Sequence, residues 1–125
     1  MKSVSIVAAV RTAVGSLGKS LKNVPAEILG SKVISEAIKS SRVNSDEIDE
    51  VIFGQVLTGG SGQNPARQAA INAGLPSEKT AYIINQVCGS GLRSIAAGYQ
   101  AIISNDSSIV IAGGQESMSN ANHII

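Results

Sequence analysis

Residues 80–103 read TAYIINQVCGSGLRSIAAGYQAII and combine a strand pattern, a tight turn and a helix pattern. The segment Thr80–Val87 is rich in apolar and β-branched residues, which is typical of a buried strand. Gly89 and Gly91 follow, and we expect these glycines to permit a tight turn and the close approach of a substrate. From residue 92 to 103 the apolar residues recur at helical spacing. The stretch therefore predicts a strand, a turn that contains Cys88, and a helix.

Similar units lie on both sides of this stretch, and together they predict an α/β fold. The order is βαβαβαβ, with a mostly parallel sheet and helices on both of its faces. The other expected strands are Ser3–Val10, Val51–Leu57 and Ser108–Ala112. The other expected helices are Pro25–Ser41 and a helix that is capped by Asn64 and stopped by Gly74. No linker divides the chain, so residues 1–125 are expected to form one domain.

The expected helix over residues 92–103 differs from the others because Arg93 is its only charge. One side holds the apolar residues Leu92, Ile95, Ala96, Tyr99, Ile102 and Ile103. The opposite side holds Ser94, Ala97, Gly98 and Ala101. A helix of this kind can be packed closely on both sides, so we expect another domain or another chain to cover the side that the sheet leaves free. A weakly amphipathic surface helix is the alternative.

Charge and composition argue against several classes of function. Ten basic and nine acidic residues are spread evenly, which leaves no basic stripe for nucleic acid. One cysteine and one histidine cannot build a disulfide framework or a metal site, so we expect no metal and a reduced, cytoplasmic setting. The first apolar run is cut by Arg11 and is too short to cross a membrane. The residues AVGSLGKS, 13–20, resemble a phosphate-binding loop only in part, because Pro25 marks a separate helix start beyond them.

Cys88 stands where a strand meets a turn and a helix, which resembles a nucleophile elbow. The helix N-terminus offers unpaired amides and partial positive charge, which favour a thiolate and suit an oxyanion. A buried cysteine that acts as a small hydrophobe fits the spacing equally well, because the chain offers no identifiable base. His123 lies near the chain end, where a solvated histidine is the more common case. Glu116 is expected to point towards the Cys88 turn as a hydrogen-bond acceptor, or else to be a solvated loop carboxylate.

Four stretches closely resemble the thiolase family, in the family's order and with compatible spacing. They are RTAVGSLGKSL, GQVLTGGSGQNPARQAAINAGLP, NQVCGSGLRSIAAGYQAI and IVIAGGQESMSNA. Ala13, Gln86 and Gln115 depart from the family's usual residues, but none of these changes removes the cysteine. The resemblance implies that Cys88 is a nucleophile that carries an acyl group as a thioester, and that its backbone amide contributes to an oxyanion hole. The residues of the supporting turn would be Asn85, Gly89, Ser90, Gly91 and Glu116.

The resemblance also implies the reaction and what the chain lacks for it. Thiolases condense two acyl-CoA molecules or cleave the product, so coenzyme A thioesters are the implied substrates and no bound cofactor is expected. The family's Gly-His-Pro, Cys-x-Gly-Gly-Gly and Asn-Glu-Ala-Phe motifs do not occur here. Because those motifs supply the base, a second proton carrier and a water site, turnover would need a missing C-terminal half. The CoA-binding residues stay unassigned, because the family's loop domain is absent too.

The fold of the family gives two further expectations. The helix after the cysteine would lie in a central layer between two similar halves, which would account for the small side of residues 92–103. The strand over residues 80–87 would lie at the sheet edge and pair across a homodimer. The alternatives are an inactive thiolase remnant that survives as a dimerising fragment and, less well supported, a ketoacyl synthase.

Overall fold

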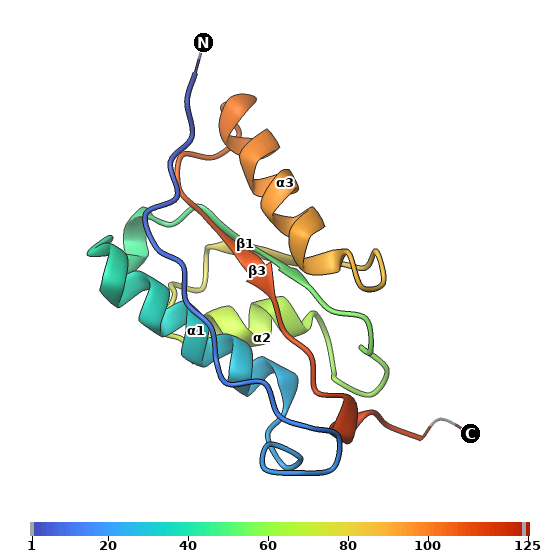
Figure 1. Ribbon diagram of the computed structural model, residues 1–125. Coiled ribbons are helices and arrows are strands. Elements are labelled where there is room, and N and C mark those ends of the chain that lie inside the picture. The colour runs from blue at the N-terminus through green and yellow to red at the C-terminus, as the bar shows by residue number, and fades with distance from the viewer. Residues whose placement is uncertain (1, 124) are drawn as a thin grey trace.

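The computed structural model describes residues 2–123 and 125, and its centre is a parallel sheet of three strands in the order β2-β1-β3. The strands are β1 (Glu50–Gly54), β2 (Thr80–Ile84) and β3 (Val110–Gly114). The helices are α1 (Ala26–Ser41), α2 (Pro65–Asn72) and α3 (Ser90–Ile103), with short 3-10 turns at Ser45–Glu47 and Met118–Asn120. Helices α1 and α2 cover one face of the sheet and α3 covers the other (Figure 1). The expected α/β fold is therefore confirmed.

The core lies between β1 and the pair α1 and α2. Val51 and Phe53 of β1 point to this side, where they pack with Ile34 of α1 and the alanines of α2. The small alanines let α2 come close to α1 and to the sheet. Since β1 is the middle strand and is buried on both faces, it reads as a continuous apolar run, as parallel strands usually do.

The ends of α1 and α2 follow the local sequence closely. Pro25 precedes α1, and the side chain of Asn64 caps α2 by accepting a hydrogen bond from the Arg67 amide at 3.1 Å. Gly74, just beyond α2, has a φ of 92°, a conformation that glycine adopts without steric cost. The stretch AVGSLGKS lies in irregular chain and turns before α1, so its lysine and serine do not open a helix.

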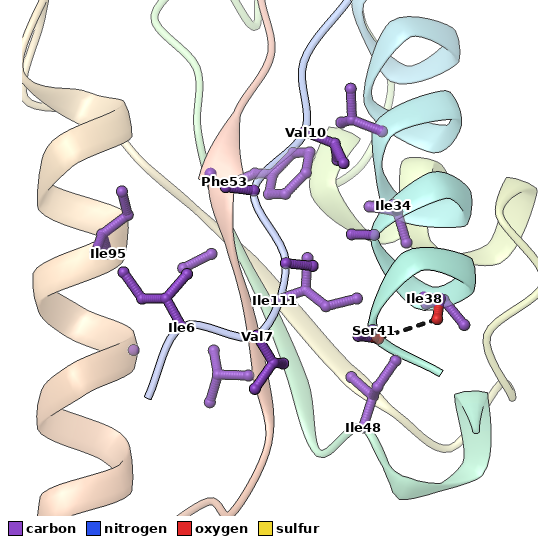
Figure 2. Close-up of a pocket in the computed structure, with 18 of the residues that line it drawn as sticks. Ile6, Val7, Val10, Ile34, Ile38, Ser41, Ile48, Phe53, Ile95 and Ile111 are labelled. Atoms are coloured by element: carbon purple, nitrogen blue, oxygen red, sulfur yellow. Dashed lines mark hydrogen bonds between the residues drawn. The ribbon is translucent and has the colours of Figure 1, made fainter. Parts of the chain in front are cut away.

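The expected first strand, Ser3–Val10, is wrong. This segment runs extended past β3 and α1 but pairs with none of the strands that the structure describes (Figure 1), and Ile6 remains 79% exposed. Between the segment, β3, α1 and α3 lies a groove of about 930 Å³ (Figure 2), which Ile6, Val7 and Val10 line from the segment's side. A strand needs a neighbouring backbone for its hydrogen bonds, and the groove separates the segment from β3. Apolar β-branched sequence alone does not supply that neighbour.

Contrary to expectation, the small side of α3 faces the sheet, and the large apolar side does not. Its small side packs on the sheet, where Ser94 and Gly98 are buried and a Cβ on Gly98 would lie 3.2 Å from a methyl carbon of Val110. Its large apolar side is left free, with Leu92 75% and Tyr99 53% exposed. The small residues are selected because they let the helix approach the strands closely. The side available to a further layer is thus the large apolar one.

Candidate active site

The candidate site lies at the carboxyl end of the parallel sheet, where β2 leads through a turn into α3. Cys88 is in this turn and is exposed, so the reading of a buried structural thiol is wrong. β2 ends at Ile84 and α3 begins at Ser90, which leaves residues 85–89 for the turn. Ligand sites of open parallel α/β sheets gather at this edge. A cysteine here can meet a substrate from solvent.

Two side chains of the turn hold its backbone in place. The Asn85 side-chain oxygen accepts a hydrogen bond from the Val87 amide at 3.0 Å. The Ser90 hydroxyl accepts one from the Gln86 amide at 2.8 Å and donates one to the Val87 carbonyl at 2.6 Å. Both residues were expected to support the turn, and these bonds give each a defined part in it.

The left-handed residue of the turn is Val87, not a glycine. Val87 has a φ of 50°, whereas Gly89 has a φ of −83° and Gly91 lies inside α3. A positive φ therefore does not explain Gly89 or Gly91, although a Cβ on Gly89 would lie 3.3 Å from the Gln86 carbonyl oxygen. A β-branched residue in this region is strained by about 1–3 kcal/mol, and such strain persists only where neighbouring groups hold it. Sequence patterns gave no signal for it, because valine is the kind of residue least expected there.

A glycine in β1 allows the turn and the start of α3 to lie against the sheet. A Cβ on Gly54 would overlap the Ser90 carbonyl carbon and come within 2.6 Å of the Gly91 nitrogen. Gly91 itself has open space where its own Cβ would be. The strictest demand for glycine near the turn thus falls on the strand beneath the helix, because two backbones meet there.

Glu116 is a hydrogen-bond acceptor, as expected, but its donors belong to a different loop. Its carboxylate accepts from the Val56 amide at 2.8 Å and the Leu57 amide at 3.3 Å, just after β1. The link to the Cys88 turn is indirect, since the Asn85 side-chain nitrogen donates to the Val56 carbonyl at 3.5 Å. These bonds also explain why β1 stops at Gly54 rather than at Leu57.

His123 is exposed, and among the described residues no hydrogen bond joins it to Cys88. It lines a shallow hollow with Gly18, Met118 and neighbouring residues. The large groove is not at the cysteine either, because its lining includes Glu116 but not Cys88. Within residues 2–123 and 125, no three histidine, cysteine or acidic side chains are grouped to hold a metal ion. No helix in that part of the chain has the length and apolar character of a membrane span.

Comparison with known proteins adds a family to this geometry. The family described as "Thiolase, N-terminal domain" matches residues 4–125. The acetyl-CoA acetyltransferase of Cupriavidus necator is 54% identical over 125 residues, which are all of this chain and 32% of that protein. The acetyl-CoA acetyltransferase of Pseudomonas aeruginosa is 53% identical over the same share of each chain. This chain therefore spans about a third of the length of the curated relatives it matches.

A solved structure agrees with the sequence matches. The crystal structure of the Bacillus anthracis acetyl-CoA acetyltransferase superposes with a TM-score of 0.93 at 39% sequence identity. The match covers 96% of this chain and 30% of that one. The likeness therefore extends over nearly the whole chain.

Proposed function

Because the chain belongs to the thiolase family, through that family's N-terminal domain, we propose that it is the N-terminal part of an acetyl-CoA acetyltransferase with Cys88 as the acyl-carrying nucleophile. The observation that carries this proposal is the exposed position of Cys88, on a held turn at the carboxyl end of the sheet. A thiol in that place is open to a CoA thioester, and the amides of the adjoining helix start favour negative charge.

The first half of the reaction uses the thiolate of Cys88. Its sulfur attacks the carbonyl carbon of acetyl-CoA, a new carbon–sulfur bond forms, and the carbonyl π electrons move to oxygen. Collapse of this oxyanion breaks the bond to the CoA sulfur, and coenzyme A leaves as a thiolate that takes up a proton. The Cys88 amide contributes to holding the oxyanion. The product is an acetyl group on Cys88.

The second half forms the carbon–carbon bond. A base removes a proton from the α carbon of a second acetyl-CoA, and the resulting carbanion attacks the acetyl carbonyl on Cys88. The bond to Cys88 then breaks, which releases acetoacetyl-CoA and restores the thiolate. The 125 residues contain no identifiable base for this step, so we assign it, with most of the CoA contacts, to the part of the relatives' length that this chain does not span.

Steady-state turnover of the full-length polypeptide that contains these residues tests the proposal. Acetoacetyl-CoA cleavage by coenzyme A is measured for the wild type and for Cys88→Ala, with folding checked by circular dichroism. We expect the variant to lose activity by a factor of about a thousand or more while it stays folded, because it has no group to carry the acyl intermediate. Equal activity in the two proteins would contradict the role of Cys88.

A second function, self-association without catalysis, is favoured by one observation. β2 is an edge strand, as expected, and in the described residues it pairs only with β1. Light scattering on the 125-residue chain tests self-association. Tyr82→Lys places a charge on the β2 edge, and the control variant Leu92→Lys places one on the free side of α3. A dimer that Tyr82→Lys disrupts and Leu92→Lys leaves intact supports pairing of the edges. A monomer at high concentration contradicts it.

A further inference from the structure

The peptide between Val87 and Cys88 is held from one side by the first residue of α3. Its carbonyl oxygen, which belongs to Val87, accepts hydrogen bonds from the Ser90 hydroxyl at 2.6 Å and from the Ser90 amide at 3.1 Å. The peptide is trans, so its N–H points opposite to its C=O. The Cys88 N–H is thereby directed away from the start of α3. Among the described residues no hydrogen bond uses this N–H.

The same hydroxyl also holds the chain one residue earlier. Ser90 accepts from the Gln86 amide at 2.8 Å, and Asn85 accepts from the Val87 amide at 3.0 Å. The peptides on both sides of Val87 are therefore fixed, and Val87 is kept at its φ of 50°. Ser90 is only 4% exposed. If its hydroxyl is removed and the turn does not rearrange, water cannot take over the hydrogen bonds that the hydroxyl made.

We propose that Ser90 is a positioning residue for acyl transfer, whose hydroxyl orients the Val87–Cys88 peptide so that the Cys88 amide faces the oxyanion of the bound thioester. This inference rests on the proposed function of Cys88 and adds a residue to it. Ser90 does not touch substrate. It acts through the peptide, and it holds that peptide in a conformation that a valine does not adopt freely.

The test compares two reactions of the same thiol in the full-length polypeptide. Acetylation of Cys88 by acetyl-CoA passes through an oxyanion, whereas alkylation by iodoacetamide is a displacement at carbon that forms none. Both rates are followed by mass spectrometry of the peptide that carries Cys88. In Ser90→Ala we expect acetylation to fall by about tenfold or more, and alkylation to stay within about threefold of the wild type. Removing an oxyanion donor entirely lowers the reaction rate by a factor of about 10²–10³, and a donor that points in the wrong direction lowers the rate by less.

Ser94→Ala is the matched control. Ser94 is buried on the same helix, and its hydroxyl also lies 2.6 Å from the carbonyl three residues before it, but its bonds go to Gly91 and Gly113 rather than to the turn. We expect this variant to keep the wild-type ratio of acetylation to alkylation. A selective loss of acetylation in Ser94→Ala would overturn the assignment to Ser90, and so would an equal loss of both reactions, or of neither, in Ser90→Ala.

A second background covers the case in which Ser90→Ala does not fold. Val87→Gly relieves the strain, so the chain folds there without the hydroxyl, but it also leaves the peptide before Cys88 free to rotate. We expect Val87→Gly/Ser90→Ala to have an acetylation-to-alkylation ratio about tenfold below that of Val87→Gly. Equal ratios would overturn the proposal. A wild-type protein that is alkylated but never acetylated would instead contradict the proposed function of Cys88, which separates the two failures.

Discussion

Gly54 of β1 lies directly against Ser90 at the start of α3, with no room for a Cβ between the two backbones. Gly54→Ala is expected to lower the free energy of unfolding by about 1–3 kcal/mol, since either the helix or the strand must shift. The same shift moves the Cys88 turn, so acetylation of Cys88 is expected to slow as well. Urea unfolding and intact mass measure the two effects.

Gly113→Ala is the control for that prediction. Gly113 is also a strand glycine, but its Cβ would make an ordinary contact with the Phe53 ring at 3.4 Å. We expect a change of less than about 1 kcal/mol and an unchanged rate of acetylation. If the two alanine variants were equally stable and equally fast, the close contact of Gly54 with α3 would not matter.

Gly30 in α1 is in a similar position against Gln115. A Cβ on Gly30 would overlap the side-chain oxygen of Gln115, which is buried and has no hydrogen-bond partner among the described residues. The Gln115 nitrogen donates to the Gln55 side-chain oxygen and the Pro65 carbonyl, so the amide cannot turn away without losing both bonds. We expect Gly30→Ala to cost about 2 kcal/mol or more, measured by urea unfolding. Gly91→Ala, a helical glycine with open space, is expected to leave stability unchanged or slightly higher, and the reverse ranking would contradict this packing.

Val87 carries a strain that a glycine would relieve. We expect Val87→Gly to raise the free energy of unfolding by up to about 1 kcal/mol, the relief being partly offset by the greater freedom of glycine in the unfolded chain. Thermal and urea unfolding give the value. A loss of more than about 1 kcal/mol would mean that the valine side chain stabilises the turn and is not merely held there.

Asp49 gives the fold a defined response to acid. Hydrogen bonds from the Ser108 and Ile109 amides, at 2.6 and 3.0 Å, hold the pKa of Asp49 below its ordinary value of 3.8. The folded state therefore releases this proton more readily than the unfolded chain does. The contribution of Asp49 to the free energy of unfolding is therefore complete above about pH 4. It is lost as the pH falls through the lowered pKa of the folded state.

Asp49→Ala tests that contribution. We expect the variant to be less stable at pH 7 by about 1 kcal/mol, because two amides that tie β1 to β3 lose a charged acceptor near the surface. Its stability should then fall less steeply than the wild type's between pH 5 and pH 3, which spans the ordinary carboxyl titration. Urea midpoints at each pH check this, with Asp46→Ala as an exposed control. Parallel pH curves for the wild type and Asp49→Ala would contradict the assignment.

Local sequence predicted the elements whose boundaries are set locally. Pro25, Asn64 and Gly74 mark the starts and the stop of α1 and α2 because caps and left-handed glycines act within a few residues. The apolar runs around Val51 and Thr80 gave the middle and edge strands. Ser3–Val10 has the same composition, but it pairs with no strand in the described part of the chain, and composition does not report a pairing partner. The pattern of residues 92–103 separates a small side from a large apolar side, but it does not show which of the two faces the sheet.

The sequence indicated candidate residues for the site, but not the contacts and hydrogen bonds that hold them in place. The resemblance of NQVCGSGLRS to thiolases led to Cys88, and the position of Glu116 after a strand led to an acceptor at the sheet's edge. The strain at Val87, the contact of Gly54 with Ser90 and the bonds from Glu116 to Val56 and Leu57 depend on tertiary approach. No spacing in the sequence encodes them. The cytoplasmic setting and the pairing of β2 across a dimer stay predictions.

Single-turnover labelling tests the central claim most directly. The full-length polypeptide is mixed with acetyl-CoA, quenched in acid, digested and read by tandem mass spectrometry. We predict one acetyl group, which is carried on Cys88 and released on adding coenzyme A. In Cys88→Ser we expect no labelling at the wild-type rate. Labelling of Cys88→Ser at the full rate, or an acetyl group carried on another residue, would contradict it.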